Sequence, residues 1–189
     1  TIGVPAVFLR LGGCNLTCGG PTSVRSKVVE KGATWRCDTM EVWTRSRDYD
    51  SSALCNVWEK EGYLPYLENG AHLVVTGGEP LLHNHHLAPF FHHFQSHYGF
   101  LPIIECETNG TLMPSGLFQD QVHFFNVSPK LSNSGMPKSK RIVPEVMNHF
   151  VSLPNAIFKF VVESECDLNE MREDYIEPFS IPMNRLYLM

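Results

Sequence analysis

Short apolar runs alternate with amphipathic segments along the chain, and turn residues separate them. The runs whose length and composition predict β-strands are Val7–Leu11, His72–Thr76, Ile103–Thr108, Phe124–Ser128, Ala156–Val162 and Leu186–Met189. The segments whose apolar residues recur every three or four positions, and so predict helices, are Ser51–Asn69, His86–Tyr98, Ile142–Phe150 and Asn169–Glu177. Between Gly110 and His123, Pro114 and Gly116 allow only a brief helix. Repeated strand–helix–strand order predicts an α/β fold with a parallel sheet.

Several predicted strands carry polar side chains on one face. Arg10 shares a face with Phe8, Glu105 shares one with Glu107, and Lys159 interrupts the apolar fifth strand. A strand buried between two helical layers is normally apolar on both faces, and an unpaired buried charge is costly. We therefore expect a partial, open (β/α)6-type barrel of mainly parallel strands with a polar lumen. The alternative is that the two cations pair with the two carboxylates and no ligand is involved.

The composition is typical of a globular domain, with 189 residues of which 43% are hydrophobic and 19% are charged. A net charge of −5 argues against a general nucleic-acid-binding surface, and no apolar run is long enough to span a membrane. We expect a single domain over residues 1–189, trimmed at both ends from a longer protein. Clustered cysteines in a chain of this kind indicate metal binding rather than disulfides, which favours the cytoplasm.

The strongest chemical signal is a group of three cysteines, Cys14, Cys18 and Cys37, in which residues 19–36 separate the last two. Three thiolates can hold three irons of a [4Fe–4S] cluster and leave the fourth iron open to a chelating ligand. Zinc usually takes four ligands, often in CxxC pairs, and the sequence has no CxxC. A zinc site completed by a distant histidine stays open as an alternative.

Three polar turns follow three consecutive predicted strands. They are Thr76-Gly77-Gly78-Glu79-Pro80, Glu107-Thr108-Asn109-Gly110 and Ser128-Pro129-Lys130. Paired glycines let the backbone approach a ligand closely, and the carboxyl ends of parallel strands meet at one edge of a sheet. The three turns therefore predict a binding site at that edge.

With these motifs the chain resembles the radical S-adenosylmethionine (SAM) superfamily, and within it the 7-carboxy-7-deazaguanine synthase family of queuosine and deazapurine biosynthesis. The residues that carry the resemblance are Gly3–Leu11, Cys14, Cys18, Cys37–Thr39, Thr76–Pro80, Glu107–Thr111, Val127–Lys130 and Leu188–Met189. The family pattern is CxxxCxxC, whereas here residues 19–36 stand before the last cysteine. We interpret this segment as a loop insertion in the cysteine motif of a radical SAM core.

The resemblance implies a role for each matching residue. Cys14, Cys18 and Cys37 would ligate the [4Fe–4S] cluster, and the Thr39 hydroxyl would bind Mg²⁺. Residues implied to bind SAM are Arg36, Asp38, Gly77, Gly78, Glu79, Thr108, Asn109, Ser128, Pro129 and Lys130. Residues implied to bind substrate are Arg10, which would pair with its carboxylate, and Thr76 and Glu107, which would hydrogen-bond its pterin edge. Arg10 and Glu107 would also take part in catalysis with the cysteines.

The implied enzyme is a carbon–nitrogen lyase that converts 6-carboxy-5,6,7,8-tetrahydropterin to 7-carboxy-7-deazaguanine and releases ammonia. The resemblance further implies a 5′-deoxyadenosyl radical made from SAM, a Mg²⁺-assisted ring contraction, an electron donor such as flavodoxin or ferredoxin, and a homodimer. Direct contact with nucleic acid or membrane is not expected. Two other functions stay open, namely activation of a glycyl-radical protein with the same cofactors and zinc binding without catalysis.

Overall fold

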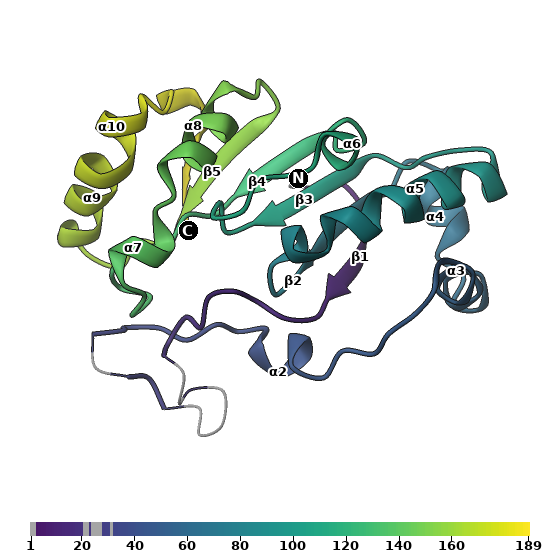
Figure 1. Cartoon of the computed structure of the whole chain (residues 1–189), viewed down its shortest axis with the longest axis horizontal. Helices are drawn as coiled ribbons and strands as arrows, with labels where there is room; N and C mark the ends of the chain where they lie inside the picture. Colours follow the sequence, from purple (N-terminus) through teal and green to yellow (C-terminus); the bar gives the residue numbers. More distant parts are fainter. Residues whose placement is uncertain (1–2, 21–22, 24–27, 31) are drawn as a thin grey trace.

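The computed structural model describes residues 3–20, 23, 28–30 and 32–189. Its centre is a six-stranded sheet in which the strands lie side by side in sequence order, as Figure 1 shows. The strands are β1 (Ala6–Leu11), β2 (His72–Gly77), β3 (Ile104–Thr108), β4 (Phe124–Val127), β5 (Ala156–Phe160) and β6 (Leu186–Leu188). Every neighbouring pair is parallel. The predicted α/β class and the partial, open barrel of parallel strands are confirmed.

Helices provide the connections between the strands. They are α2 (Met40–Trp43), α3 (Ser51–Lys60), α4 (Leu64–Glu68), η1 (Pro80–His83), α5 (Asn84–Tyr98), α6 (Gly116–Gln119), α7 (Lys138–Arg141), α8 (Pro144–Ser152), α9 (Glu165–Met171), η2 (Arg172–Ile176), α10 (Glu177–Phe179) and η3 (Met183–Arg185). Parallel strands in sequence order require crossovers of one hand, which places the helices on one face of the sheet. None of the helices in the described part of the chain combines the length and apolar character needed to cross a membrane.

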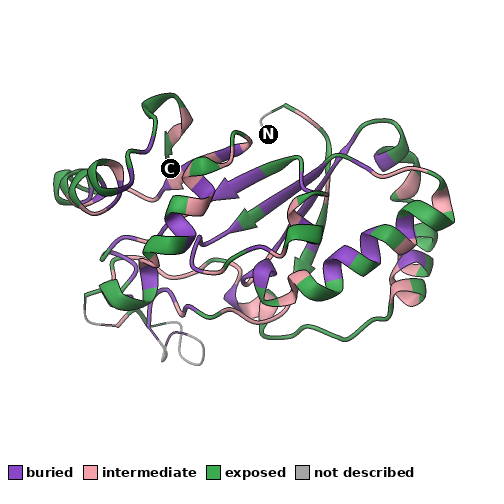
Figure 2. Ribbon diagram, turned by 45° about the horizontal axis from the view of Figure 1, so that its top comes forward, coloured by how far each residue is buried: buried purple, intermediate pink, exposed green. Residues whose placement is uncertain are grey.

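The two faces of the sheet differ in burial. Residues such as Val75, Cys106 and Phe158 are completely buried on the face that the helices cover. Figure 2 shows buried residues concentrated in the strands and on the sides of the helices that face them. On the opposite face of the edge strand β1, the Phe8 side chain is 53% exposed. Successive side chains of a strand therefore point to opposite faces of the sheet, as the sequence predicted. Where apolar residues alternate with polar ones, only one face needs to be covered.

The predicted helix Ser51–Asn69 is wrong as a single element, because α3 ends at Lys60 and α4 begins at Leu64. Gly62 between them has φ +73°, a left-handed conformation that ends a helix readily only when the residue is glycine. Pro65 then occupies the first turn of α4, where its missing N–H costs no hydrogen bond. The apolar face continues through both helices, so periodicity alone did not reveal the break.

The predicted helix Asn169–Glu177 begins earlier than its apolar pattern suggests. Ser164 caps α9 in a capping box, in which its side chain accepts from the Asp167 backbone N–H and Asp167 accepts in return. The following segment, Arg172–Ile176, has π-helical hydrogen bonding rather than α-helical. The polar first turn of α9 hid its start from a search for apolar residues.

Candidate functional site

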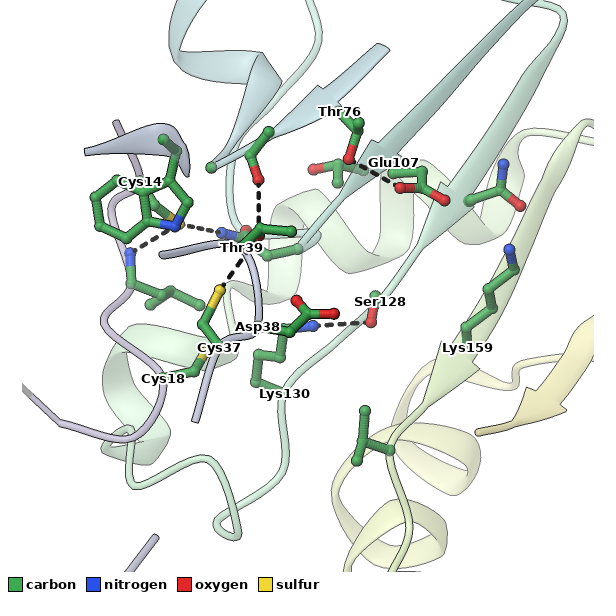
Figure 3. Close-up of a pocket in the computed structure, with 18 of the residues that line it drawn as sticks. Cys14, Cys18, Cys37, Asp38, Thr39, Thr76, Glu107, Ser128, Lys130 and Lys159 are labelled. Carbon is green, nitrogen blue, oxygen red and sulfur yellow. Dashed lines mark hydrogen bonds between the residues drawn. The ribbon is translucent and has the colours of Figure 1, made fainter. Parts of the chain in front are cut away.

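A cavity of about 510 Å³ opens at the carboxyl ends of the central strands. Its size is in the range of small-molecule sites. The predicted site residues that line it are Cys14, Cys18, Arg36, Cys37, Asp38, Thr39, Thr76, Gly77, Gly78, Glu107, Thr108, Asn109, Ser128 and Lys130. Figure 3 shows many of these side chains around one space, although they come from separate loops and strands. The fold therefore brings the cysteine loop and the three polar turns together.

Three predicted site residues, Arg10, Glu79 and Pro129, do not line this cavity. The lining also includes residues that the motifs did not identify as site residues, namely Leu16, Trp35, Trp43, Asn126, Lys159, Val161 and Met189. Asn126 and Lys159 lie on the polar strand face, so their polarity was the available signal. The two tryptophans gave no signal that distinguishes a cavity wall from ordinary packing.

The three cysteines form one side of the cavity and are free thiols. Together with Leu16, Trp35 and Met136 they make a small apolar cluster separate from the main core. The Leu16 backbone N–H donates to Cys14 Sγ at 3.4 Å, and the Cys37 Sγ and Thr39 Oγ1 atoms are 3.5 Å apart. Thiols on a shared wall, with no disulfide among them, are suited to bind a metal cluster.

Burial sets the protonation of these thiols. Desolvation raises the pKa of Cys14 and raises that of Cys18 to about 11, while the Lys130 ammonium acts to lower both. Such thiols stay neutral at physiological pH unless a bound cation stabilises their thiolates. The chemistry of the site therefore fits a ligand that brings positive charge to the sulfur atoms.

Both ends of the predicted insertion 19–36 are held by the same loop. The Gly19 N–H donates to the Ser134 carbonyl at 2.9 Å, and the Thr34 N–H donates to the Asn133 carbonyl at 2.8 Å. The Cys37 N–H then donates to the Cys18 carbonyl at 3.2 Å. Cys18 and Cys37 are thus neighbours in space despite their separation in sequence. Residues 21–22, 24–27 and 31 of the insertion lie outside the described residues.

The paired glycines hold the polar turn at the end of β2 against the cysteine loop. Gly78 N–H donates to the Leu11 carbonyl at 3.0 Å, and Glu79 N–H donates to the Gly13 carbonyl at 2.9 Å. A Cβ atom on Gly78 would lie 1.8 Å from the Gly13 carbonyl oxygen, and one on Gly77 would lie 2.2 Å from the Leu11 oxygen. Gly77 also has φ +130°. Only glycine fits at either position, so these residues set the place of the loop that carries Cys14.

Glu79 lies behind the cavity rather than in its wall. Its carboxylate is completely buried and accepts hydrogen bonds from Leu81 N–H at 3.0 Å, Thr108 Oγ1 at 2.7 Å and Asn109 N–H at 2.7 Å. These contacts join the end of β2 to the end of β3. Desolvation raises the pKa of Glu79 above its ordinary value of 4.5, although the hydrogen bonds oppose that shift.

We expect the Glu79→Gln variant to be less stable than the wild type, by about 1–3 kcal/mol, because an amide cannot accept all three donors. The raised pKa means that the folded protein binds the Glu79 proton more tightly than the unfolded chain does. The contribution of Glu79 is therefore fully present below pH 4.5 and is lost as the pH rises through its higher folded pKa. Urea unfolding of the wild type and of Glu79→Gln at several pH values measures the difference in their free energy of unfolding, which must become smaller as the pH rises.

The matched control for this prediction is Glu68→Gln, since Glu68 is an exposed residue at the end of α4. Its unfolding free energy should stay within about 0.5 kcal/mol of the wild type at each pH. If the difference in unfolding free energy between the wild type and Glu79→Gln grows with pH, desolvation is not the dominant influence on the pKa of Glu79.

A polar network joins the cysteine loop to the end of β3. Asn109 Nδ2 donates to Asn15 Oδ1 at 2.8 Å, and Asn15 Nδ2 donates to Thr111 Oγ1 at 2.7 Å. Asn109 Oδ1 accepts from the Thr111 hydroxyl at 2.6 Å. Asn15 follows Cys14 directly, so this network orients the first cysteine from the side opposite the paired glycines.

The polar strand face forms the rest of the lumen. Thr76 Oγ1 donates to Glu107 Oε2 at 2.8 Å, and Asn126 Nδ2 donates to Glu105 Oε2 at 2.9 Å. His72 Nδ1 lies 2.5 Å from Glu105 Oε1. Glu107 therefore has a neutral partner on β2, and the partners of Glu105 include an amide on β4 and a histidine on β2.

The alternative in which Arg10 and Lys159 neutralise Glu105 and Glu107 is wrong within the described chain, where neither cation forms an ion pair. Arg10 is exposed, and its guanidinium carbon lies 5.4 Å from the centre of the Phe8 ring. Its backbone is in register with Thr76 on β2, so it stands on the same face of the sheet as the cavity.

Among the described residues, no group of three or more His, Cys, Asp or Glu is arranged to hold a single metal ion. This finding applies equally to the zinc and the cluster alternatives, because both depend on the same three cysteines. Three cysteines around a larger shared space match the donor set of a cluster better than that of a mononuclear site.

Comparison with known proteins gives a consistent picture, although no family model matches the chain. The chain is 31% identical over 188 residues to a protein of Pyrobaculum aerophilum named 7-carboxy-7-deazaguanine synthase, covering 100% of the chain and 71% of that relative. A protein of Hyperthermus butylicus with the same name is 31% identical over 189 residues, covering 99% of the chain and 69% of the relative. A third, from Aquifex aeolicus, is 30% identical over 181 residues, which are 94% of the chain and 65% of the relative.

Proposed function

The chain belongs to the 7-carboxy-7-deazaguanine synthase family, which is a family of enzymes, and we propose that it converts 6-carboxy-5,6,7,8-tetrahydropterin to 7-carboxy-7-deazaguanine and ammonia. The observation that carries this proposal is the meeting of three free cysteines and the paired-glycine turn at one cavity. We place the enzyme in the cytoplasm, as a homodimer that receives electrons from a donor such as flavodoxin or ferredoxin.

The residues on the cysteine side fit the implied cofactors. Cys14, Cys18 and Cys37 would hold a [4Fe–4S] cluster, because they are three free thiols at one cavity wall. The raised pKa values of Cys14 and Cys18 mean that these two need a cationic partner to ionise. The backbone of Gly77 and Gly78 lines the cavity beside them and would contact SAM, since glycine has no side chain to keep a ligand away. When bound, the cluster and SAM supply one-electron chemistry that begins with a radical, and Mg²⁺ supplies a Lewis acid.

The chain's own residues position these groups. Lys130 Nζ donates to Ser128 Oγ at 2.8 Å and lies 5.8 Å from the centre of the Trp35 ring, so its charge is fixed near the cysteines. That charge favours anionic sulfur and would attract the carboxylate of SAM. Glu79 supports the site from behind through Thr108 and Asn109 rather than touching a cofactor.

The lumen side suits a pterin ring. Thr76 and Glu107 present a hydroxyl and a carboxylate at neighbouring positions, and Asn126 adds an amide from β4. A carboxylate only accepts hydrogen bonds, so Glu107 would take N–H donors from the amino-pyrimidinone edge of the substrate. A lumen of this kind favours a small molecule over the glycyl-radical protein of the activase alternative.

The proposal is tested by an anaerobic assay with carboxytetrahydropterin, SAM, Mg²⁺ and a reductant after reconstitution with iron and sulfide. We expect 7-carboxy-7-deazaguanine and ammonia to form in equal amounts over many turnovers. The proposed substrate would be wrong if the protein binds the cluster and cleaves SAM with each reductant tested, but leaves the pterin unchanged. A protein that binds only zinc under these conditions would overturn the enzyme class.

We expect Thr39→Ala to lower turnover about 10- to 100-fold and to raise the Mg²⁺ concentration needed for half-maximal rate. The Thr39 hydroxyl lies at the cavity wall, 3.5 Å from the Gly77 carbonyl oxygen, and is a hard oxygen donor of the kind that Mg²⁺ binds. Turnover measured against Mg²⁺ concentration gives both values. Thr39→Ser keeps the hydroxyl and should recover most of the rate.

The matched control for Thr39 is Thr44→Ala. Thr44 lies just after α2, is exposed, and its hydroxyl donates to the Met40 carbonyl at 2.7 Å. Its removal should leave the Mg²⁺ dependence unchanged. Equal Mg²⁺ dependence in Thr39→Ala and the wild type would remove Thr39 from the metal site while leaving the cysteine assignments intact.

A further inference from the structure

Lys159 occupies an unusual place on the polar strand face. It lies on β5, is partly buried, and lines the same cavity as Thr76 and Glu107. Within the described chain, its ammonium has neither a hydrogen-bond partner nor an ion-pair partner. An ammonium without a partner at a cavity wall is free to bind an anion that enters the cavity.

The other cations of the cavity are already engaged. Among the described residues, the cationic lining residues are Arg36, Lys130 and Lys159. Arg36 pairs with Glu41 at 2.8 Å, and Lys130 donates to Ser128 at 2.8 Å beside the Trp35 ring. Lys159 is therefore the cation of this wall that has no partner in the described chain, whereas Lys130, whose hydrogen bond is to a neutral hydroxyl, keeps its charge for the carboxylate of SAM.

The position of Lys159 points to substrate rather than to SAM. Lys130 Nζ lies 5.8 Å from the centre of the Trp35 ring, which packs in the same small cluster as Cys14, Cys18 and Cys37. Figure 3 shows Lys159 on the far side of the cavity from those cysteines, extending from β5 toward the space that Glu107 faces. An anion bound by Lys159 would thus lie over the strands, where Thr76 and Glu107 would take the heterocycle.

We propose that Lys159 binds the carboxylate of the pterin substrate, an assignment that rests on the proposed function. Glu107 on β3 accepts hydrogen bonds and Lys159 on β5 only donates them, so the lumen carries opposite charges on strands that flank β4. The substrate has a matching polarity, with N–H donors on its pyrimidinone edge and a carboxylate on the reduced ring. Lys159 thereby fixes which way the ring lies. It takes the place at the substrate carboxylate that the resemblance implied for Arg10, because Arg10 lies on the edge strand β1 with β2, β3 and β4 between it and β5.

The test compares two probes on the reconstituted enzyme with SAM present. One probe is 7-carboxy-7-deazaguanine and the other is its 7-carboxamide analogue, which has the same shape without the charge. Lys159→Met should weaken binding of the carboxylate probe about 10- to 100-fold and that of the carboxamide less than about 3-fold, because only the former loses a charge-assisted hydrogen bond. Lys159→Arg should restore most of the lost affinity.

Lys140→Met is the matched control, since Lys140 is an exposed lysine of α7. It should bind both probes as the wild type does. Equal binding of the carboxylate probe by Lys159→Met and the wild type would overturn the proposal, and so would an equal loss for both probes, which would indicate a role in shape alone.

Three further outcomes separate this proposal from the assignment of SAM and from the proposed function. Weaker SAM binding in Lys159→Met, with the carboxylate probe unaffected, would assign the anion to SAM and overturn the substrate assignment. If the wild type turns over the pterin and Lys159→Met binds every ligand as the wild type does, Lys159 has no role in the substrate site. The proposed function would then still stand. A wild type that neither binds the probe nor turns over the pterin would remove both.

Discussion

Replacing Cys14 by alanine is expected to abolish turnover and to remove most of the bound iron and sulfide. Cys14 lies at the cavity wall, in a loop that the Gly77–Gly78 turn holds on one side and the Asn109 network on the other. With two thiolates left, the cluster would lack one of its three protein ligands. The loss should exceed about 100-fold, which is the upper end of the effect of removing an outer-shell partner of a metal ligand.

Iron and sulfide analysis, visible absorbance and anaerobic turnover measure this effect together. Cys166→Ala is the matched control, because Cys166 is an exposed cysteine of α9 and does not line the cavity. It should keep the iron content and the rate of the wild type. Full cluster occupancy in Cys14→Ala would show that this sulfur is not a ligand and would reopen the choice among metal sites.

Strand prediction succeeded because burial of one face leaves a simple pattern. In β3, Ile104 and Cys106 are completely buried on the helix-covered face, and the residues that alternate with them are polar, so the alternation of residue types can be read directly. Burial itself does not alternate, because Glu105 is only 2% exposed whereas Glu107 on the same face is exposed. Helix ends were harder to predict because they depend on local backbone geometry. The left-handed Gly62 divides α3 from α4 without disturbing the apolar face, so the sequence pattern continued across the break.

The candidate site was predictable where chemistry is concentrated in motifs. The three cysteines and the three polar turns were expected together, and the structure brings them to one cavity. The direction of single side chains was not predictable from the motifs. Glu79 follows two glycines whose conformation turns its carboxylate inward, where it meets Thr108 and the backbone of Asn109. Sequence alone did not distinguish that supporting position from a place in the cavity wall.

Arg10 and Lys159 also show that the sequence alone does not predict which charged side chain lines the cavity. Both were recognised as charges on a polar strand face, but only Arg10 belongs to a recognisable motif. The structure leaves Arg10 exposed at the edge strand and places Lys159 in the cavity. Which of two such residues reaches a site depends on the curvature of the sheet and on the residues around each side chain. The alternation of side chains along a strand reveals neither.

The Gly78→Ala variant is expected to lose both stability and the cluster. The added methyl carbon would lie 1.8 Å from the Gly13 carbonyl oxygen and 3.1 Å from Cys14 Cβ, distances that force the two loops apart. The backbone hydrogen bonds from Gly78 to Leu11 and from Glu79 to Gly13 would then break. Overpacking and two lost hydrogen bonds together should lower the free energy of unfolding by about 3 kcal/mol or more.

Gly116→Ala is the matched control for Gly78→Ala. Gly116 begins α6, and a Cβ atom added there meets nothing within 4 Å. Alanine favours a helix over glycine, so this variant should be as stable as the wild type or more stable by up to about 1 kcal/mol. Urea unfolding and iron content distinguish the two substitutions. Because Gly78 carries no functional group, a loss of iron at that position alone would show that backbone contact between the turn and the loop holds Cys14 in place. Wild-type unfolding and iron content in Gly78→Ala would instead show that the cysteine loop finds its position without that contact.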